Sequence, residues 1–281
     1  MPGAVDLHTH TTASDGTFTP RQLVGEAAQR GLRVLAVTDH DSTDALAEAL
    51  DEAARHRPLE IVPGVEINCE VEGAEIHILG YYLDYEVAWF QDFCREQRLE
   101  RRARVHRITD RLAQLGMPVE PDEVLALCGE GSAGRPHVAR VMVRRGYVKS
   151  VREAFDKYLG AGRAAHVPRK RLSPEDAVRL IRRAGGVPVF AHPGLAQRDG
   201  IIPPLIAAGL MGLECYYSEH SATQTAGYVQ LCLDHGLVAT GGSDFHGPKI
   251  RAATLGVPAV PMAAWEGLKS KAAEARASAS S

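Results

Sequence analysis

The sequence contains no long hydrophobic run and no closely spaced pair of cysteines. Its apolar stretches fall short of the length needed to cross a membrane, and no charged N-terminal segment precedes an apolar stretch of the kind found in secretion signals. The five cysteines are an odd number and lie far apart, which argues against a disulfide framework and against a zinc knuckle. We therefore expect a cytoplasmic protein with buried or incidental thiols.

Charge of one sign is not in excess either. Lys and Arg number 32 against 35 Asp and Glu, which gives a formal net charge of −3. The overall charge therefore favours neither nucleic acid nor a membrane as partner, and an anionic ligand must be held by a local group of side chains. The length of 281 residues and the hydrophobic content of 45% suit one large α/β domain or two smaller ones.

Apolar segments typical of buried strands alternate with segments of helical periodicity. The first strand begins with Val5 and Leu7. Further strands are expected within 32–40, 59–68, 74–83, 187–192, 212–217 and 235–247, with a turn at Glu72–Gly73 between the third and the fourth. This alternation predicts a parallel barrel or a doubly wound sheet, both of which hold their functional residues at the carboxyl ends of the strands.

Capping signals mark where two of the intervening helices begin. Thr19 and Pro20 are a suitable N-cap and first helical residue for a helix that stops at Gly31. Ser173 and Pro174 play the same parts for a later helix. Each of these helices leads into an apolar strand, as the alternating fold requires.

The strand pattern disappears between residues 86 and 165, where only helical patterns remain. We expect 86–165 to form a helical insertion that caps the site, and 1–85 with 166–281 to form the barrel domain. The stretch from Arg95 to Arg111 is rich in arginine but also carries glutamates, so it predicts an exposed helix laced by salt bridges. The small and polar tail, 271–281, is expected to fray.

Imidazole and carboxylate side chains gather at or just beyond the ends of the expected strands. His8 and His10 are two residues apart on a strand, so both point to the same face. Nine residues of these types share such positions: His8, His10, Asp15, His40, Glu66, His77, His192, Asp244 and His246. Because strand ends meet at one edge of the fold, we expect a single cluster.

Imidazole and carboxylate ligands without cysteine suit zinc, manganese or iron(II) rather than soft metals or calcium. Nine donors exceed the needs of one ion, whereas two or three ions that share a carboxylate would use them. Clustered divalent ions lower the pKa of a bound water and neutralise phosphoryl oxygens. The residues therefore predict metal-assisted hydrolysis of a phosphate ester.

The motifs in their order resemble those of the PHP (polymerase and histidinol phosphatase) family. The segments "DLHTHTTASDG", "TDHD", "GVEI", "HILGY", "AHPG" and "GSDFH" carry this resemblance, and "GRPHVAR" and "SEHS" bring it closest to the stand-alone nucleoside 3′,5′-bisphosphate phosphatases and 5′-to-3′ oligonucleotide exonucleases. The resemblance covers nearly the whole chain. It implies a distorted (β/α)7 barrel with a helical insertion and a centre of three metal ions.

The resemblance also implies how the nine residues divide among the metals. The first metal would take His8, His10, Glu66 and Asp244. The second would take Asp15, His40 and His246. Glu66 would bridge to a third, which would also take His77 and His192. Every ligand position of the family is filled, so the resemblance implies an active enzyme.

Three further residues are candidates for contacts with the substrate. Arg135 and His137 in "GRPHVAR" lie near the expected start of a helix, a place that favours phosphate, and His220 in "SEHS" is a candidate group near the leaving oxygen. The resemblance departs after "HPG", where relatives often have Arg-Tyr and this chain has Leu195 and Ala196. We expect the corresponding phosphate or base contact to be absent or supplied from elsewhere.

The leading hypothesis is a phosphoesterase that removes the 3′-phosphate of a nucleotide such as adenosine 3′,5′-bisphosphate, or trims short RNA from its 5′ end. We expect a small nucleotide or short oligonucleotide as substrate, no membrane and no obligate protein partner. The alternatives are histidinol phosphatase, an amidohydrolase-type C–N hydrolase and a metal-stabilised binding module. The amidohydrolase type commonly uses a carboxylated lysine where this chain offers Glu66, and the complete ligand set argues against a binding module.

Overall fold

A computed structural model describes residues 4–71, 74–129, 131–168, 172–248 and 253–279. The expected turn at 72–73 lies outside these residues. Seven strands form one sheet in chain order. They are β1 (Val5–Asp6), β2 (Val34–Val37), β3 (Glu60–Val71), β4 (Ala74–Tyr81), β5 (Val187–Phe190), β6 (Gly212–Tyr217) and β7 (Val238–Gly242).

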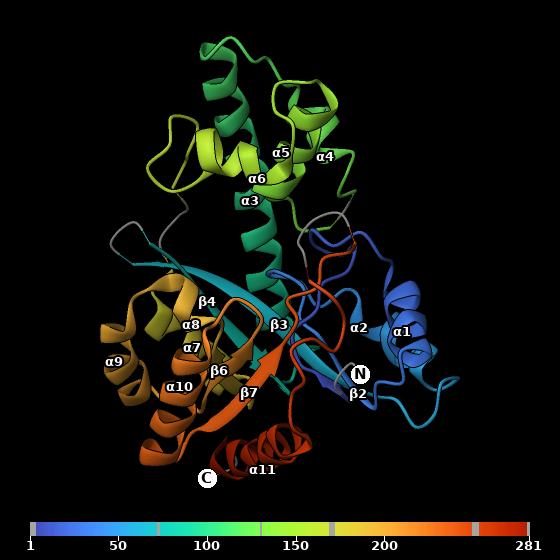
Figure 1. The fold of residues 1–281 in the computed structure, drawn as a ribbon, viewed down its shortest axis with the longest axis vertical. Coiled ribbons are helices and arrows are strands. Elements are labelled where there is room, and N and C mark those ends of the chain that lie inside the picture. The colour runs from blue at the N-terminus through green and yellow to red at the C-terminus, as the bar shows by residue number, and fades with distance from the viewer. Residues whose placement is uncertain (1–3, 72–73, 130, 169–171, 249–252, 280–281) are drawn as a thin grey trace.

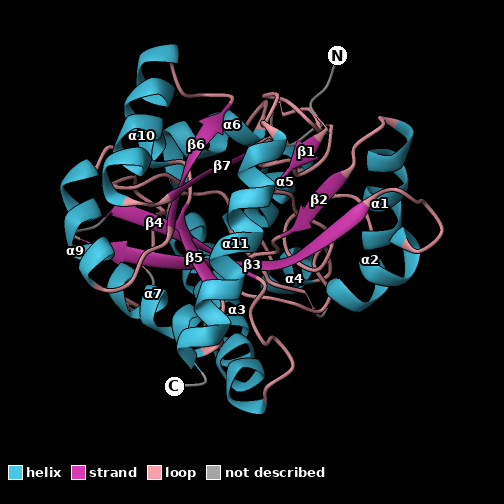
Figure 2. Ribbon diagram, turned by 90° about the horizontal axis from the view of Figure 1, so that it is seen from below, coloured by secondary structure: helices cyan, strands magenta, loops and turns pink. Residues whose placement is uncertain are grey.

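The sheet curls into a nearly closed barrel (Figure 2). The first and last strands meet where the backbone N–H of Leu7 donates to the carbonyl oxygen of Gly241 at 3.1 Å. Four of the strand pairings are parallel, but β4 runs antiparallel to both β3 and β5. The distorted (β/α)7 barrel that the resemblance implies is confirmed. The parallel barrel that the strand pattern predicts is wrong for β4, because β4 pairs antiparallel with both of its neighbours.

Helices cover the outside of this barrel (Figure 2). They are α1 (Pro20–Gln29), α2 (Leu46–Ala53), α7 (Pro174–Arg183), α8 (Pro193–Ala196), α9 (Ile202–Ala207) with the short 3-10 turn η2 (Asp199–Ile201), α10 (Ala222–His235) and α11 (Met262–Ala279). The predicted caps are confirmed: Thr19 accepts from the backbone N–H of Gln22, and Ser173 accepts from that of Asp176. Gly31 follows α1 with a φ of 78°.

The C-terminal segment is helical instead of frayed. α11 extends to Ala279 and lies across one end of the barrel, at the bottom of Figure 1. Trp265, Leu268 and Ala272 recur at helical spacing and pack against buried side chains of the strands. The expectation of a frayed tail is therefore wrong for residues 271–279, because an apolar face within a weakly hydrophobic sequence closes the bottom of the barrel.

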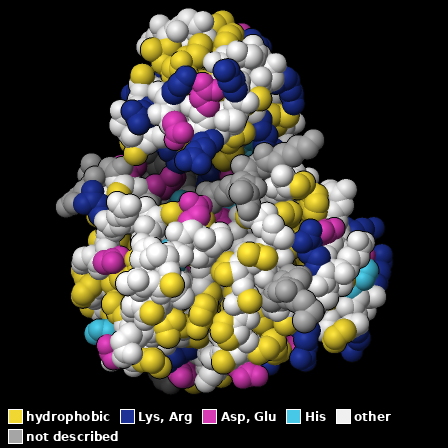
Figure 3. Space-filling model, in the orientation of Figure 1, with side chains coloured by type: hydrophobic (Ala, Val, Ile, Leu, Met, Phe, Trp, Pro, Cys, Tyr) yellow, Lys and Arg dark blue, Asp and Glu magenta, His cyan; other side chains and the backbone are white. Residues whose placement is uncertain are grey.

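A helical lobe stands above the barrel, built from elements between β4 and β5 (Figure 1). It consists of the second half of α3 (Ala88–Gln114) with α4 (Pro121–Leu125), α5 (Arg135–Arg144), α6 (Val151–Ala154) and the π-helical η1 (Phe155–Leu159). The lobe has a core of its own, in which Ile108, Leu112 and Met142 are fully buried. Lys and Arg side chains gather on its surface (Figure 3).

The arginine-rich part of α3 is only partly the exposed helix that was expected. Arg101 and Arg104 are 6% and 7% exposed. The Nε of Arg101 donates to Asp41 Oδ2 at 2.7 Å, and that of Arg104 donates to the carbonyl oxygen of Val167 at 2.7 Å. The expectation is wrong for these two arginines, because the barrel loop after β2 and the segment that follows the lobe supply acceptors for them.

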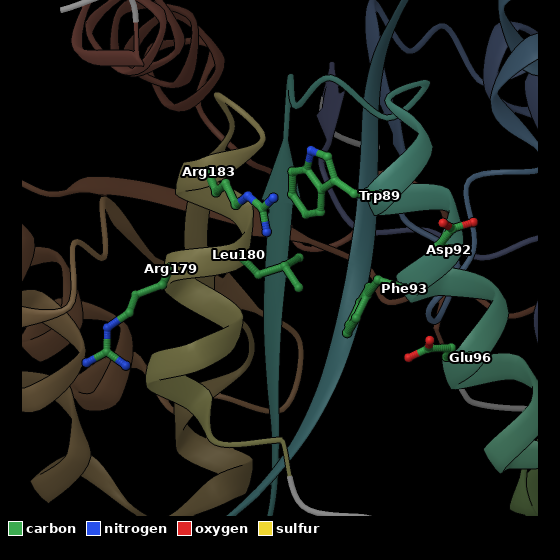
Figure 4. A pocket seen from close by; sticks show the side chains of 7 residues that line it. All are labelled: Trp89, Asp92, Phe93, Glu96, Arg179, Leu180 and Arg183. Carbon is green, nitrogen blue, oxygen red and sulfur yellow. The ribbon is translucent and has the colours of Figure 1, made fainter.

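A cavity of about 470 Å³ lies on the outer wall of the barrel, between the first turns of α3 and the helix α7 (Figure 4). Trp89, Phe93 and Leu180 line it, and the guanidinium carbon of Arg183 lies 4.1 Å from the centre of the Trp89 ring. None of its lining residues belongs to the nine predicted ligands. The five cysteines are buried, as expected. Among the described helices, none has the length and hydropathy of a membrane span.

Candidate metal centre

The nine predicted ligand residues meet at the edge of the barrel that faces the helical lobe. His8 and His10 follow β1, and Asp244 and His246 follow β7, which lies beside it. The two segments approach so closely that a Cβ on Gly242 would stand 2.4 Å from the Cβ of His8. Only glycine fits there, and this close approach brings the residues that follow the two strands together.

Five histidines surround the carboxylate of Glu66, which is completely buried. Each places one ring nitrogen within 3.3 Å of a Glu66 oxygen: His8 Nε2 at 3.1 Å, His10 Nε2 at 3.0 Å, His40 Nδ1 at 3.1 Å, His77 Nδ1 at 2.6 Å and His192 Nε2 at 3.3 Å. One carboxylate therefore contacts imidazoles carried by four different strands or the loops that follow them.

These side chains form three groups whose nitrogen and oxygen atoms could each surround one ion. The first contains His8, His10, Glu66 and Asp244; the second contains His10, Asp15, His40 and His246; the third contains His40, Glu66 and His77. Within each group the ligand atoms lie within 4.8 Å of one another. The first group is the one that the resemblance implied, the second adds His10, and the third contains His40 where His192 was expected.

Several polar atoms in these groups are buried and form no hydrogen bond of good geometry with any described residue, although each lies 3.0, 3.1 or 3.2 Å from an atom of another ligand residue. They are His10 Nε2, Asp15 Oδ1 and His40 Nδ1. A buried polar atom without a hydrogen-bond partner costs free energy, and burial of so many charged groups is tolerated where they are paired or bind a metal. The donor set of imidazole and carboxylate therefore fits divalent first-row ions.

The buried carboxylates of the centre stabilise positive charge on the groups around them. Burial alone would lower the pKa of His10, but the carboxylates of Asp244 and Glu66 outweigh it and raise this pKa to about 9. Burial would likewise raise the pKa of Glu66, yet His40 and His8 hold it well below its ordinary value. Because a divalent cation competes with protons for the same atom, a metal bound at His10 would displace its proton.

Arg135 and His137 stand at the start of α5, as the sequence predicts. The guanidinium of Arg135 contacts the carboxylate of Glu75 and donates to the carbonyl oxygen of Leu159 at 3.2 Å. The Nδ1 of His137 accepts from the backbone N–H of Gly134 at 3.1 Å, and the side chain is 1% exposed. The structure thus places Arg135 beside the strand that carries His77 and uses His137 to cap its own helix.

His220 lies beside the loop that carries His192. Its Nδ1 donates to the carbonyl oxygen of Cys215 at 3.0 Å, and its Nε2 accepts from the backbone N–H of Gly194 at 3.1 Å. Both ring nitrogens are therefore engaged, and a neutral imidazole satisfies both bonds. Leu195, in the same loop, is 40% exposed.

Comparison with known proteins assigns the chain to a family. The PHP domain matches residues 6–161, which is more than half of the chain. This chain belongs to the PHP family. The match includes both strands of the β3–β4 hairpin and six of the nine clustered residues.

Individual PHP proteins resemble nearly the whole chain. The "5'-3' exoribonuclease Rnm" of Salmonella typhimurium is 36% identical over 86% of this chain and 85% of its own length. The "3',5'-nucleoside bisphosphate phosphatase" of Chromobacterium violaceum is 36% identical over 87% of both. The crystal structure of a candidate metal-dependent phosphoesterase from Bifidobacterium adolescentis has a TM-score of 0.88, at 31% identity, over 96% of this chain and 98% of that chain. This PHP protein is a metal-dependent phosphoesterase, a hydrolase.

Two of the clustered residues of this PHP enzyme are not at strand ends. Glu66 lies inside β3 and His77 inside β4. The parallel pairing of β2 with β3 stops at Val37 and Pro63, and His40 then forms a bridge with Glu66. The expectation was wrong for Glu66 and His77, because β3 continues past the edge of the barrel and β4 returns antiparallel from beyond it.

Sequence reasoning missed three carboxylates that support the centre. Glu214 is fully buried, and its Oε1 lies 3.0 Å from His8 Nδ1. Asp39 accepts from Thr11 and Ser14 in the loop between His10 and Asp15. Asp6 accepts from the backbone N–H groups of Ser243 and Gly256, at 2.9 Å each. An isolated charge in the apolar strand "GLECYY" was the available signal for Glu214.

Proposed function

We propose that this PHP enzyme removes the 3′-phosphate of nucleoside 3′,5′-bisphosphates, such as adenosine 3′,5′-bisphosphate, and also trims short RNA from its 5′ end. One observation supports the proposal. Arg135 contacts Glu75, and Glu75 lies beside His77, one of the histidines around Glu66. The cluster suits a reacting phosphate, and Arg135 suits a second anion on the same molecule. The names of the two relatives, a bisphosphate phosphatase and an exoribonuclease, support the same substrate class.

We assign two or three divalent ions of manganese, iron or zinc to the three groups. The first ion would be held by His8, His10, Glu66 and Asp244. The second would be held by Asp15, His40 and His246, with His10 beside them. The third would be held by Glu66, His77 and His192, with His40 nearby. When bound, such ions supply a hydroxide at neutral pH and positive charge for the phosphoryl oxygens. Glu66 contributes a carboxylate to two of the three groups.

The other residues of the site bind and orient. We propose that Arg135 holds the non-reacting phosphate, with His137 fixing the first turn of α5 from which Arg135 projects. His220 keeps the loop of His192 in place through Gly194, and because both of its ring nitrogens are engaged we assign it this positioning role in place of a donor near the leaving oxygen. Leu195 and Ala196 offer no charged group to a phosphate, so Arg135 takes a larger share of that contact.

The helical insertion, 86–165, is proposed to act as a cap over the barrel formed by 1–85 and 166–281. The helical lobe stands over the edge of the barrel that carries the cluster (Figure 1). Arg101 links the two parts, since it donates to Asp41 in the barrel and to the carbonyl oxygen of Ala133 in the lobe. A cap at this place would exclude water and position the nucleotide.

A phosphate-release screen with product analysis tests the proposal. The purified protein with added Mn²⁺ is assayed on adenosine 3′,5′-bisphosphate, adenosine 3′-monophosphate, histidinol phosphate and 5′-phosphorylated short RNA. Inorganic phosphate and AMP from the bisphosphate support the phosphatase, and mononucleotides released from the RNA support the exonuclease. Turnover of histidinol phosphate alone, or of none of the four, overturns the proposal. Glu66→Gln is the inactive reference, and Glu60→Gln, an exposed change at the far end of β3, is its matched control.

A further inference from the structure

The guanidinium of Arg135, which the proposed function assigns to a phosphate, is paired with the carboxylate of Glu75. The Nη2 of Arg135 contacts Glu75 Oε2, Nη1 donates to the carbonyl oxygen of Leu159, and the guanidinium carbon lies 5.3 Å from the centre of the Phe155 ring. The side chain of Arg135 is 14% exposed, and that of Glu75 is 30% exposed. Leu159 and Phe155 therefore hold the guanidinium on two sides, and Glu75 fills a third.

Glu75 is an acidic residue among basic ones. Arg135, Arg104 and His77 all lie close enough to lower the pKa of its carboxyl, and together they outweigh burial, which would raise it. His166 lies near Arg135, Arg104 and Glu75 as well. A carboxylate at the centre of such a group balances charge that would otherwise attract an external anion.

The position of Glu75 relates Arg135 to the metal centre. Glu75 and His77 are two residues apart on β4 and point to the same face. Glu75 Oε1 lies 4.0 Å from His77 Nε2, and His77 Nδ1 lies 2.6 Å from Glu66. The contact between Glu75 and Arg135 thus lies on the far side of the His77 ring from Glu66, where a second phosphate would fall rather than the reacting one.

We propose that Glu75 is a specificity-determining residue: in the free protein its carboxylate holds the place at Arg135 that the non-reacting phosphate of the substrate takes in the complex. The inference rests on the proposed function. Carboxylate and phosphate both match the planar donor fork of arginine, so one can replace the other. A substrate with a second phosphate must displace Glu75, whereas a substrate without one leaves the pair intact.

The exchange sets the difference in affinity between the two kinds of substrate. An internal anion that competes for Arg135 weakens binding of a bisphosphate and has no effect on a monophosphate that lacks the second group. Removing the charge of Glu75 therefore strengthens binding of the bisphosphate alone. A role of Glu75 in merely holding Arg135 in position predicts the opposite change.

Steady-state kinetics of Glu75→Gln provide the test in the manganese-loaded enzyme. For adenosine 3′,5′-bisphosphate we expect KM to fall on the order of tenfold with little change in kcat, since a like charge next to the bound phosphate is removed. For adenosine 3′-monophosphate, which has only the reacting phosphate, kcat/KM stays within about twofold. Glu60→Gln removes the same charge far from the lobe and leaves both substrates unchanged.

Two further variants separate the exchange from other effects. Glu75→Ala removes the carboxylate without introducing an amide that could itself bond to phosphate, and the same fall in KM is expected. Adding Arg135→Ala to Glu75→Gln abolishes the gain if the two residues act as one unit. A bisphosphate KM that is unchanged or higher in both single variants overturns the exchange, as does a gain that survives without Arg135.

Binding to the metal-free protein distinguishes failure of this inference from failure of the proposed function. Isothermal titration with 5′-AMP, whose single phosphate is the proposed partner of Arg135, is expected to show tighter binding to Glu75→Gln than to wild type. If the wild type hydrolyses no nucleotide, the proposed function fails while this titration still reports on the exchange. If hydrolysis is observed but the affinity for 5′-AMP is the same in both proteins, the exchange is wrong and the function stands.

Discussion

The carboxylate of Glu214 is shared between the two segments that carry His8 and His192. Its Oε1 lies 3.0 Å from the Nδ1 of His8, and its Oε2 accepts from the backbone N–H of His192 at 2.8 Å. Held in this way, the ring of His8 directs Nε2 to Glu66 and Asp244, at 3.1 and 3.5 Å. A residue in the middle of β6 thus sets the orientation of a proposed ligand that follows β1.

Glu214→Gln is expected to weaken metal binding on the order of 10- to 100-fold, because loss of the carboxylate partner of a metal-binding histidine lowers its basicity and frees its orientation. The measurement is the metal content that remains after dialysis against graded chelator concentrations. Glu219→Gln, an exposed change that follows the same strand, serves as control. Equal metal retention in wild type and Glu214→Gln would show that His8 does not need this partner.

Glu66→Gln should affect the enzyme far more than its small change in size suggests. A neutral amide cannot bridge cations, so kcat is expected to drop on the order of 10²-fold or more, with loss of bound metal. Metal analysis and turnover of the same preparation are measured together. Near-normal turnover with normal metal content would exclude Glu66 as the shared ligand.

The fully active protein is expected to contain more than one equivalent of divalent transition metal per chain. The ligand atoms form three groups, two of which contain Glu66, and one ion would leave most of these atoms without a partner. Elemental analysis of an active preparation, repeated after chelation and re-addition of Mn²⁺, measures the number. A single equivalent at full activity contradicts the multinuclear assignment.

Much of this architecture could be predicted because its signals are local. The strand segments and the caps at Thr19 and Ser173 depend on residues that are near one another in sequence, and the clustering of the histidines follows from their places at or near strand ends. The placement of His77 could not be predicted in the same way. Its position follows from the antiparallel return of β4, and an apolar strand pattern does not reveal the direction in which a strand pairs.

The residues missed in the sequence owe their roles to distant partners. Arg101 resembles the other arginines of a charged helix, yet it is buried because Asp41 lies across the interface between lobe and barrel. Glu214 belongs to an apolar strand, and only the closure of the barrel brings it to His8. Partners separated by 60 and 206 residues leave no periodic pattern in the chain.

Acid is expected to destabilise the helical lobe through His137. Burial, with Arg140 and Arg101 nearby, lowers the pKa of this imidazole to about 4, although Asp15 opposes the shift. Because the folded pKa is below the ordinary value of about 6.5, the neutral ring contributes stability above that pH. This stability is lost as the pH falls toward 4, up to a limit of about 3 kcal/mol.

His137→Gln keeps a side-chain acceptor for the N–H of Gly134 and removes the titration. We expect its free energy of unfolding to decrease less than that of wild type between pH 7 and pH 4.5. Urea unfolding across this range measures the difference, with the exposed His106→Gln in α3 as control. Parallel pH curves for wild type and His137→Gln would show that His137 is not responsible.

Arg135→Ala is expected to damage hydrolysis of a doubly phosphorylated nucleotide much more than that of p-nitrophenyl phosphate. Binding energy from a non-reacting phosphate is used to orient the reacting centre, and the generic ester has no such group to lose. Loss of a charge-assisted contact from a partly buried arginine costs ~2–4 kcal/mol, which corresponds to tens to hundreds of fold in kcat/KM. The variant should therefore lower the ratio of the two kcat/KM values.

The measurement compares kcat/KM for both substrates, in wild type and variant, at one manganese concentration. Arg144→Ala, an exposed change at the other end of α5, controls for the loss of a positive charge from the same helix. Equal losses on the two substrates would place Arg135 at the reacting phosphate or in the scaffold. No loss on either would leave the contact with Glu75 as a structural ion pair, in which case the second phosphate must be held by another group.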